Sequence, residues 1–322
     1  MKKIGVFTSG GDSPGMNACI RAVVRTGIHF GLEIVGIKRG FQGFIDKEFI
    51  PLYSHSVSRI IKQGGTILHS ARSEEFKTKA GRKKAYQNLI AENIDALVVI
   101  GGDGSFTGAK IFNEEFDFPI IGCPGTIDND LYGTDFTIGY DTAINTAMEA
   151  IDKIKDTANA HDRLFFIEVM GRDAGFIALS AGVAVGAEAV LIPESKTDIN
   201  SLVQLLKNNY SNKKTSNIVV VAEGDDAGGA FKIAEEVKKR FNQVDMRVTI
   251  LGHIQRGGKP TAMERVRASR MGMEAVKALL NSRRGEMVGI INNQIVFTPF
   301  EKAIKYHNEI NPVMLEMVKI LS

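Results

Sequence analysis

The sequence predicts an α/β protein built from mainly parallel sheets that are flanked by helices. Short runs of β-branched and other apolar residues recur along the chain, and longer segments with helical spacing lie between most of them. The expected strands are continuously apolar rather than alternating, which is typical of sheets covered on both faces. Alternation of such strands with helices is the pattern of a parallel sheet.

The elements follow one another as strand, turn and helix. The expected strands are residues 3–7, 33–37, 96–101, 119–123, 164–169, 189–192, 217–223, 247–252 and 288–291. The clearest helical segments are residues 15–29, 142–158 and 261–281. Several strands end directly in glycine-rich turns, at residues 8–15, 100–105, 170–175 and 251–258. Because ligands of open α/β sheets bind beyond the carboxyl ends of the strands, we expect these turns to build one site.

Length and composition are those of an ordinary globular protein with two domains. The chain has 322 residues, of which 44% are apolar and 24% charged, so it can form a sizeable core. No clear linker divides it, and we therefore expect two interleaved domains. The formal charge of +3 is too small to favour nucleic acid or a membrane surface as a partner.

The cysteines and the apolar stretches favour a cytoplasmic protein. The two cysteines, Cys19 and Cys123, argue against a disulfide framework and fit a reducing compartment. The apolar stretch near the amino terminus is too short for a signal peptide. The longest uncharged run, residues 174–187, is shorter than the roughly 18 residues of a membrane-spanning helix.

The segment IGGDGSFTGAK, residues 100–110, has the pattern of a phosphate-binding turn. A strand and paired glycines precede Asp103 and a helical segment, and backbone N–H groups at a helix start attract anions. Asp103 could hold Mg²⁺ that binds the phosphates, or it could simply cap the helix. The segment matches neither the P-loop nor the G-x-G-x-x-G pattern, so alone it does not name a substrate.

A second turn of this kind is TSGGDSPGMN, residues 8–17, which again joins a strand to a helix through glycines. The N–H group of Gly11 could bind a phosphate, because glycine lets a ligand approach the backbone closely. The other interpretation is a tight connection with no ligand. The two turns strengthen each other, since both fall in the same half of the chain.

The acidic segment PGTIDND, residues 124–130, follows the expected strand 119–123. A carboxylate at the carboxyl end of a strand can act as a base or hold a cation. Asp128 could take the proton of an attacking hydroxyl while Thr126 binds the transferring phosphoryl group. Asp130 could assist with Mg²⁺ or support the turn, and both carboxylates could instead bond to the local backbone.

Arginines gather at expected strand ends and turns, where a guanidinium group matches phosphate with a rigid fork of donors. They are Arg72, Arg163, Arg172, Arg247 and Arg256. Each could instead form a structural ion pair. His253 could bond to a substrate hydroxyl or phosphate, and Glu223 could accept hydrogen bonds from sugar hydroxyls or only end its strand.

Taken in order, these motifs resemble the phosphofructokinase family. They are TSGGDSPGMN, GGT and SAR within residues 64–72, GGDGS, PGTIDND, HDR, EVMGRDAG, AEG and LGHIQRGG. The chain looks like a bacterial ATP-dependent member over essentially its full length, and the combination of PGTIDND, MGR and GHIQRGG is the most specific part. The resemblance implies phosphorylation of the C1 hydroxyl of fructose 6-phosphate in glycolysis, with ATP as donor and Mg²⁺ as cofactor.

The resemblance also implies how the chain is divided and assembled. The ATP-binding domain would be residues 1–139 plus 255–302, and the sugar-phosphate-binding domain would be residues 140–254 plus 303–322. The family is homotetrameric, and its active sites receive residues from a neighbouring subunit. We therefore expect a homotetramer that acts on fructose 6-phosphate and ATP.

The roles of family residues carry over motif by motif. Asp128 resembles the base, and Arg172 and Thr126 resemble stabilisers of the transferring phosphoryl group. The ATP site would comprise Gly11, Arg72, Ser73, Gly102, Asp103, Gly104 and Ser105, with Asp103 toward Mg²⁺. The sugar-phosphate site would comprise Thr126, Ile127, Asp128, Arg163, Met170, Gly171, Arg172, Glu223, Arg247, His253, Ile254, Gln255 and Arg256. Within it, Arg163 and Arg247 match arginines that family members lend across an interface to the 6-phosphate.

Three other functions remain as alternatives. Pyrophosphate-dependent relatives resemble this pattern but carry an acid in place of Gly104 and a lysine in place of Gly125, and both positions are glycine here. Other GGDG kinases act on NAD or lipids, and PGTIDND and GHIQRGG separate this chain from them. A non-catalytic nucleotide sensor would be expected to lose Asp128, Asp103 or Arg172, and all three are present.

Family members also bind ADP or phosphoenolpyruvate at an effector site between subunits. The matching residues are Arg21, Arg25, Lys155, Gly186, Glu188, Lys213 and Lys214, with Lys155 in place of the usual arginine. Ser54 stands where an effector-binding arginine is often found, and Arg59 replaces an acid. The pair Arg21 and Arg25 could equally lie on a solvated helix face. We therefore do not expect ordinary allosteric control.

Overall fold

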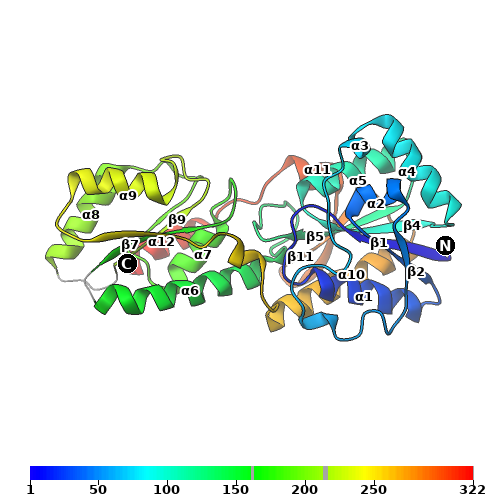
Figure 1. The fold of residues 1–322 in the computed structure, drawn as a ribbon, viewed down its shortest axis with the longest axis horizontal. Coiled ribbons are helices and arrows are strands. Elements are labelled where there is room, and N and C mark those ends of the chain that lie inside the picture. The colour runs from blue at the N-terminus through cyan, green and yellow to red at the C-terminus, as the bar shows by residue number, and fades with distance from the viewer. Residues whose placement is uncertain (161–162, 213–216, 322) are drawn as a thin grey trace. The chain divides into compact units, whose positions relative to one another are not determined.

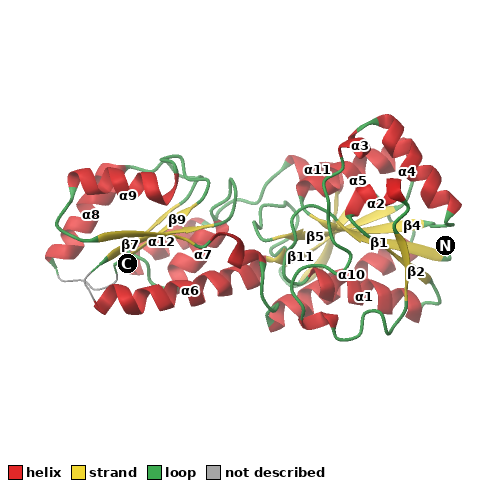
Figure 2. Cartoon of the chain, viewed as in Figure 1, coloured by secondary structure: helices red, strands yellow, loops and turns green. Residues whose placement is uncertain are grey.

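The computed structural model describes residues 1–160, 163–212 and 217–321. The chain forms two compact units and visits them alternately. Unit 1 comprises residues 1–127, 131–142 and 256–308, and unit 2 comprises residues 128–130, 143–255 and 309–322. Figure 2 shows strands flanked by helices in each unit, which confirms the α/β fold class with mainly parallel sheets. No helix within the described ranges is both long and apolar enough to span a membrane.

Unit 1 is built on a sheet with the strand order β12–β11–β5–β4–β1–β2–β3, and the short β6 pairs with β5. The strands are Lys3–Thr8 (β1), Glu33–Ile37 (β2), Phe49–Leu52 (β3), Ala96–Gly101 (β4), Ile120–Thr126 (β5), Ile138–Gly139 (β6), Glu286–Ile291 (β11) and Gln294–Pro299 (β12). The inner strands are parallel, whereas the edge strands β3 and β12 pair antiparallel with their neighbours. The sequence-based expectations did not include either edge strand.

Helices cover both faces of this sheet (Figure 1). On one face lie α1 (Met16–His29) and α10 (Ala262–Leu280), and on the other lie α2 (Gly40–Asp46), α3 (Glu74–Lys77), α4 (Lys79–Ala91), α5 (Asp103–Phe116) and α11 (Phe300–Lys305). The one-turn helix η1 (Ile60–Lys62) follows β3. The glycine at position 272 lets α10 approach α1 closely, because a Cβ there would stand only 2.6 Å from the carbonyl oxygen of Cys19. The other face holds an aromatic core around Phe7, Phe44 and Phe112.

Unit 2 has a parallel sheet with the strand order β10–β7–β9–β8. Its strands are Leu164–Val169 (β7), Ala189–Leu191 (β8), Ile218–Ala222 (β9) and Met246–Ile250 (β10). One face packs against α8 (Ile199–Ser211) and α9 (Gly229–Arg240), and the other against α7 (Phe176–Ala184) and α12 (Pro312–Leu321). The chain passes between the units on either side of residues 128–130, within α6 (Tyr140–Ala160), within the 3₁₀ helix η2 (Gly252–Arg256) and between residues 308 and 309.

The expected domain ranges and the two units differ at these passages. Gln255 and residues 128–130 group with unit 2, whereas residues 140–142 and 303–308 group with unit 1. The assignment of one unit to ATP and the other to the sugar phosphate stays a prediction.

Candidate active site

The first cluster of candidate residues lies at the carboxyl ends of β1, β4 and β5 in unit 1. These strands are neighbours in register, with Thr8 opposite Ile100 and Gly101 opposite Pro124. The turns after them therefore begin side by side at one edge of the sheet, where open α/β sheets bind ligands. The N–H group of Ser9 donates to the carbonyl oxygen of Ile100 (3.0 Å) and links the first two turns.

Glycines allow these turns to approach one another closely. A Cβ on Gly101 would stand 2.4 Å from Oγ of Ser105, so no larger residue fits there without rearrangement. A Cβ on Gly11 would stand 2.9 Å from Nη1 of Arg256. That guanidinium group donates to the carbonyl oxygen of Asp12 (3.2 Å). The fold thus brings Arg256, which is distant in sequence, against the Gly11 turn.

Helix α5 begins at Asp103 with an open amino end. Its N-cap is Gly102, which has no side chain, so Asp103 is not the cap that the simpler interpretation would require. Oδ1 of Asp103 is buried and has no hydrogen-bond partner among the described residues. Gly104 faces open space: apart from its chain neighbours and the backbone of its own helix, no atom of the described residues lies within 4 Å of the position of a Cβ. A helix start with an unpartnered carboxylate oxygen and adjacent space suits a metal-bound phosphate.

A metal ion at Asp103 would need ligands from outside the protein. In the part of the chain that the structure describes, no group of three or more His, Cys, Asp and Glu side chains could hold a metal ion. Mg²⁺ commonly binds through one or two carboxylates together with substrate phosphates. The surroundings of Asp103 therefore fit Mg²⁺ that arrives with a nucleotide.

The end of β5 lies beside this helix start. A Cβ on Gly102 would be 3.6 Å from Cβ of Thr126, the last residue of the strand. The carbonyl oxygen of Thr126 accepts a hydrogen bond from Oγ1 of Thr137 (2.7 Å), which fixes the strand end. Asp128 follows two residues later, is 4% exposed and groups with unit 2. The chain itself thus joins the candidate base to the phosphate-binding turns.

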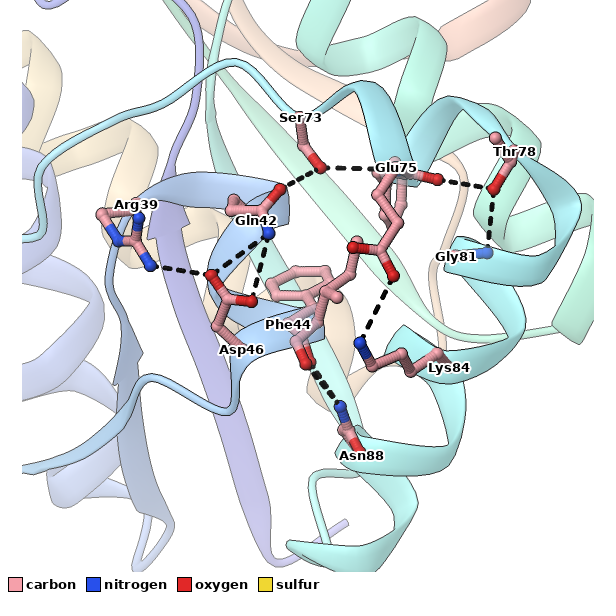
Figure 3. Close-up of polar contacts among 12 residues, drawn as sticks. Arg39, Gln42, Phe44, Asp46, Ser73, Glu75, Thr78, Gly81, Lys84 and Asn88 are labelled. Atoms are coloured by element: carbon pink, nitrogen blue, oxygen red, sulfur yellow. Dashed lines mark hydrogen bonds and ion pairs between the residues drawn. The ribbon is translucent and has the colours of Figure 1, made fainter.

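Arg72 and Ser73 follow a segment that is held to the same strand edge. Oγ1 of Thr8 donates to the carbonyl oxygen of His69 (2.8 Å). The hydroxyl of Ser73 caps helix α3 and donates to Gln42 (2.7 Å), as Figure 3 shows. Arg72 is exposed and makes no hydrogen bond or ion pair with any described residue. Its guanidinium group is therefore available to an anion.

The second cluster lies at the carboxyl ends of β7, β9 and β10 in unit 2. β7 and β9 end in register, so Met170 and Glu223 leave the sheet side by side. The N–H group of Met170 donates to Oε1 of Gln255 (3.0 Å). The N–H group of Arg172 donates to Oε1 of Glu223 (2.9 Å). Three turns that are distant in sequence are therefore fixed against one another.

The backbone around Arg172 is tightly shaped. Its φ of 53° lies in the left-handed region, which residues other than glycine rarely adopt. A Cβ on Gly171, with φ 151°, would stand 2.4 Å from the carbonyl oxygen of Ala174. The side chain of Arg172 is exposed and makes no hydrogen bond or ion pair within the described ranges. A strained backbone thus presents the guanidinium group of Arg172.

The remaining sugar-phosphate candidates differ in exposure. His253 and Ile254 are exposed on η2, whereas Gln255 is fully buried. Nε2 of Gln255 has no hydrogen-bond partner among the residues that the structure describes. Ile127 stands between Thr126 and Asp128 in the sequence, but its side chain is buried in the core.

Arg163 and Arg247 lie near the amino ends of the unit 2 strands, whereas the second cluster lies at their carboxyl ends. Both pair with Asp245, at 3.0 Å and 2.9 Å respectively, near the amino ends of β7 and β10. β7 has six residues, a length of roughly 17–20 Å. Within this chain these arginines therefore lie away from Met170 and Glu223.

The expected effector residues in unit 1 are on α1. Arg21 and Arg25 are one helical turn apart, and Arg21 is half-buried. Burial and the nearby charge of Arg25 lower the pKa of Arg21. An anion between two cations held this close would stabilise the charges of both. The role of the pair in effector binding stays a prediction.

The other expected effector residues are in unit 2. Nζ of Lys155 donates to the carbonyl oxygen of Val185 (2.7 Å) at the end of α7, where Gly186 takes the left-handed conformation (φ 62°) that commonly ends a helix. Glu188 is buried and accepts a hydrogen bond from Asn209. Lys213 and Lys214 lie outside the described residues. The effector assignments stay predictions.

Two polar side chains near these turns were not expected from the sequence. Gln42 bonds to Ser73, 31 residues away, and no sequence pattern connects them. Glu264 on α10 is buried and accepts hydrogen bonds from the N–H and Oγ1 of Thr142 (3.2 Å each). Burial raises the pKa of Glu264 to about 7. The spacing of Thr261 and Glu264 is that of a capping box, which could have drawn attention to them.

Comparisons with known proteins assign the chain to a family. A sequence model described as phosphofructokinase matches residues 3–279. ATP-dependent 6-phosphofructokinase 2 of Bacteroides thetaiotaomicron is 55% identical over 322 residues, which cover 100% of this chain and 99% of that protein. ATP-dependent 6-phosphofructokinase 1 of Thermus thermophilus is 53% identical, with 100% of both chains covered.

Solved structures agree with that match. Phosphofructokinase from Saccharomyces cerevisiae superposes with a TM-score of 0.91 at 39% identity, over 95% of this chain and 45% of that one. The pyrophosphate-dependent phosphofructokinase from Marinobacter aquaeolei gives a TM-score of 0.85 at 22% identity, over 97% and 86% of the two chains, and supports the fold alone. With identity above one half along its whole length, this chain belongs to the phosphofructokinase family.

Proposed function

We propose that this protein transfers the γ-phosphoryl group of ATP to the C1 hydroxyl of fructose 6-phosphate, which yields fructose 1,6-bisphosphate and ADP. The observation that carries the proposal is the open start of α5. There, the buried Oδ1 of Asp103 lacks a hydrogen-bond partner among the described residues, and the end of β5 lies beside it. Relatives named ATP-dependent 6-phosphofructokinase, 53% to 55% identical over the full chain, support the same reaction.

The nucleotide phosphates would meet backbone N–H groups at Gly11 and at the start of α5, with Ser105 and Arg72 beside them. Asp103 would hold Mg²⁺, which would neutralise part of the phosphate charge. Gly104 leaves the open space that a nucleotide requires. Gly125 differs from Gly104 in this respect, because a Cβ at Gly125 would stand 2.9 Å from Cε of Met16.

Asp128 would accept the proton of the sugar's C1 hydroxyl as that oxygen attacks phosphorus. Thr126 and the guanidinium group of Arg172 would stabilise the charge on the migrating phosphoryl group. Phosphoryl transfer asks the protein mainly for positioning and charge stabilisation. Backbone strain at Arg172 and the fixed end of β5 support both requirements.

The sugar phosphate would be bound by groups of the second cluster, by His253 and Ile254 of η2, and by Arg256, which lies against the Gly11 turn. They are Met170, Gly171, Glu223, His253, Ile254, Gln255 and Arg256. Arg163 and Arg247 would serve the 6-phosphate of a neighbouring subunit, because they lie at the far edge of their own sheet. This proposal requires a homotetramer, and exposed apolar side chains on α12, such as Val313 and Ile320, offer surface for association.

Pyrophosphate is the competing phosphoryl donor. A glycine at position 104 favours ATP, because an acidic side chain would extend into the open space beside Asp103. An assay that couples fructose 1,6-bisphosphate to aldolase, run with fructose 6-phosphate and either ATP or pyrophosphate, tests the choice. We expect turnover with ATP and Mg²⁺ only; turnover with pyrophosphate alone would overturn the proposal.

We further propose that effector control is weak. Lys155 and Gly186 have structural contacts at the end of α7, and Ser54 replaces an arginine expected at an effector site. ADP and phosphoenolpyruvate should therefore leave the fructose 6-phosphate saturation curve unchanged. A shift of the half-saturation point by either compound would contradict this.

We also propose a cytoplasmic location. Cys19 and Cys123 are both buried and not joined in a disulfide. This state suits a reducing compartment, and fractionation of cells followed by activity measurement would test the assignment.

A further inference from the structure

We infer that Gln42 is a positioning residue for the nucleotide, and that Ser73 acts through Gln42 by fixing Arg72 rather than by bonding to ATP with its hydroxyl. The inference rests on the proposed function, which places Arg72 beside the nucleotide phosphates. Figure 3 shows its central hydrogen bonds, which link Arg39, Asp46, Gln42 and Ser73, all within unit 1.

The hydroxyl of Ser73 is fully committed. It accepts a hydrogen bond from the N–H group of Phe76 (3.2 Å), which caps helix α3. It donates to Oε1 of Gln42 (2.7 Å). A serine hydroxyl has a single proton to donate, and here Gln42 receives it. Ser73 is therefore not available as a donor to a nucleotide phosphate while this contact exists.

Asp46 sets the orientation of the Gln42 amide. Nε2 of Gln42 lies 3.1 Å from each carboxylate oxygen of Asp46. A flipped amide would place Oε1 against the carboxylate, and two acceptors repel each other. Nη2 of Arg39 in turn donates to Asp46 (2.7 Å), while its Nε donates to Glu48 (2.7 Å). Arg39 and Gln42 thus both donate to the Asp46 carboxylate, and Ser73 donates to Gln42. Every contact in this network pairs a donor with an acceptor only when the Gln42 amide has this orientation.

Helix α2, which carries Gln42, is a rigid support. Nδ2 of Asn88 donates to the carbonyl oxygens of Phe44 (2.9 Å) and Ile45 (3.1 Å) at the end of that helix. The ring of Phe41 on α2 stacks on Phe76 of α3 with centroids 4.1 Å apart. The two helices are thus joined by the stacked rings of Phe41 and Phe76 and by the hydrogen bond between Ser73 and Gln42.

Arg72 is the residue whose place depends on this bond. Its side chain makes no hydrogen bond or ion pair with any described residue, so its position follows from the backbone on either side. Loss of the Gln42 contact would let the segment move, and nucleotide binding would then have to order it. We expect weaker ATP binding, with unchanged affinity for fructose 6-phosphate.

A pair of substitutions that reverses donor and acceptor tests the inference. Gln42→Glu places a carboxylate against Asp46 and should raise the KM for ATP about fivefold to tenfold, the size expected for one lost hydrogen bond. Adding Asp46→Asn supplies an amide donor to the new Glu side chain and leaves an oxygen for Arg39. The double variant should therefore return to within about twofold of the wild-type KM. Gln42→Met, which has similar length and no hydrogen-bonding amide, should be as weak as Gln42→Glu and should not be rescued by Asp46→Asn.

Direct binding of a non-hydrolysable ATP analogue, measured by calorimetry without sugar phosphate, separates this inference from the reaction itself. The analogue should bind the single variants more weakly and the double variant normally. Lys84→Ala is a matched control, because it breaks the neighbouring contact with Glu75 (3.3 Å) and leaves Gln42 intact. Unchanged analogue binding in Gln42→Glu, or an equal rise of both KM values, would overturn the positioning role. If the wild type failed to phosphorylate fructose 6-phosphate but analogue binding followed this pattern, the proposed reaction alone would fall.

Discussion

Gly224 lies directly against the backbone of Arg172. A Cβ on Gly224 would stand 2.1 Å from the carbonyl oxygen of Arg172 and 3.2 Å from Cα of Asp173. The N–H group of Arg172 is held on its other side by Glu223 (2.9 Å). The turn after β9 therefore fixes the residue that presents the Arg172 guanidinium group, and only glycine leaves room for it.

The first prediction is that Gly224→Ala lowers turnover by displacing Arg172. A displacement of about 1 Å in a catalytic group can reduce the rate about 10²-fold. Arg172→Ala should lower kcat by about 10²–10³-fold, the loss typical of one transition-state donor. The measurement is kcat at saturating ATP and fructose 6-phosphate for both single variants and their combination. Because both changes act on one guanidinium group, the double variant should be no slower than Arg172→Ala.

Gly31→Ala is the control for this prediction. Gly31 also has a positive φ (75°), but no atom lies within 4 Å of where its Cβ would be. The change should reduce stability slightly and leave kcat unchanged. Equal losses of kcat in the two glycine variants would mean that general strain, and not the position of Arg172, limits turnover.

The second prediction separates the two acids after β5. Asp128→Ser should lower kcat by about 10²–10⁴-fold, because it removes the proposed base. Asp130→Ser should lower kcat by a smaller factor, since the expected role of Asp130 is to support the turn or the metal ion. Steady-state kinetics with both substrates saturating give the comparison. Near-normal turnover of Asp128→Ser would remove that residue from the proton transfer.

The fold and much of the first cluster followed from sequence because buried parallel strands are continuously apolar and end in glycine turns. The edge strands did not, since β3 and β12 are only partly buried and both contain proline. Gln42 was not predictable for another reason. Its contact with Ser73 exists only after α2 and α3 pack against the same aromatic core, and a half-buried glutamine on a helix has no distinctive pattern.

The third prediction concerns the arginines at the amino edge of the unit 2 sheet. Arg163→Ala and Arg247→Ala should each raise the KM for fructose 6-phosphate about tenfold or more, the worth of a charge-assisted hydrogen bond. kcat should change little, because the 6-phosphate does not react. Arg240→Ala, which breaks an exposed pair with Glu236 on α9, should change neither constant. A rise in the KM for ATP alone would assign these arginines elsewhere.

The fourth prediction tests the open space at Gly104. Gly104→Asp should fold normally, because no atom lies within 4 Å of the new Cβ. The added negative charge beside the nucleotide phosphates should raise the KM for ATP and leave that for fructose 6-phosphate unchanged. Gly125→Lys should instead lower the melting temperature, since its Cβ would press on Met16 and Gly101. An unchanged KM for ATP in Gly104→Asp would move the phosphates away from this helix start.

The fifth prediction is a pH-dependent loss of stability caused by Glu264. Burial is the main reason that its pKa is raised to about 7 from an ordinary value of 4.5, the negative charge of Asp141 adds to the effect, and hydrogen bonds from Gly139 and Thr142 oppose it. The folded protein therefore holds this proton more tightly than the unfolded chain does. The resulting stability is fully present below about pH 4.5 and is lost as the pH rises to about 7. The free energy of unfolding changes by about 3 kcal/mol, because a difference of one between the two pKa values is worth about 1.36 kcal/mol.

Glu264→Gln removes the titration while keeping the size of the side chain and its acceptor oxygen. Denaturant unfolding at pH 5 and pH 8 should show the wild type losing free energy of unfolding relative to Glu264→Gln as the pH rises. Glu74→Gln, which changes an exposed acid paired with Lys77, should follow the wild type at both pH values. If the difference between wild type and Glu264→Gln stayed constant with pH, the carboxyl group would be ionised in the folded protein throughout this range. The Thr142 N–H and hydroxyl groups, together with the backbone of Gly139, would then compensate the buried charge in full.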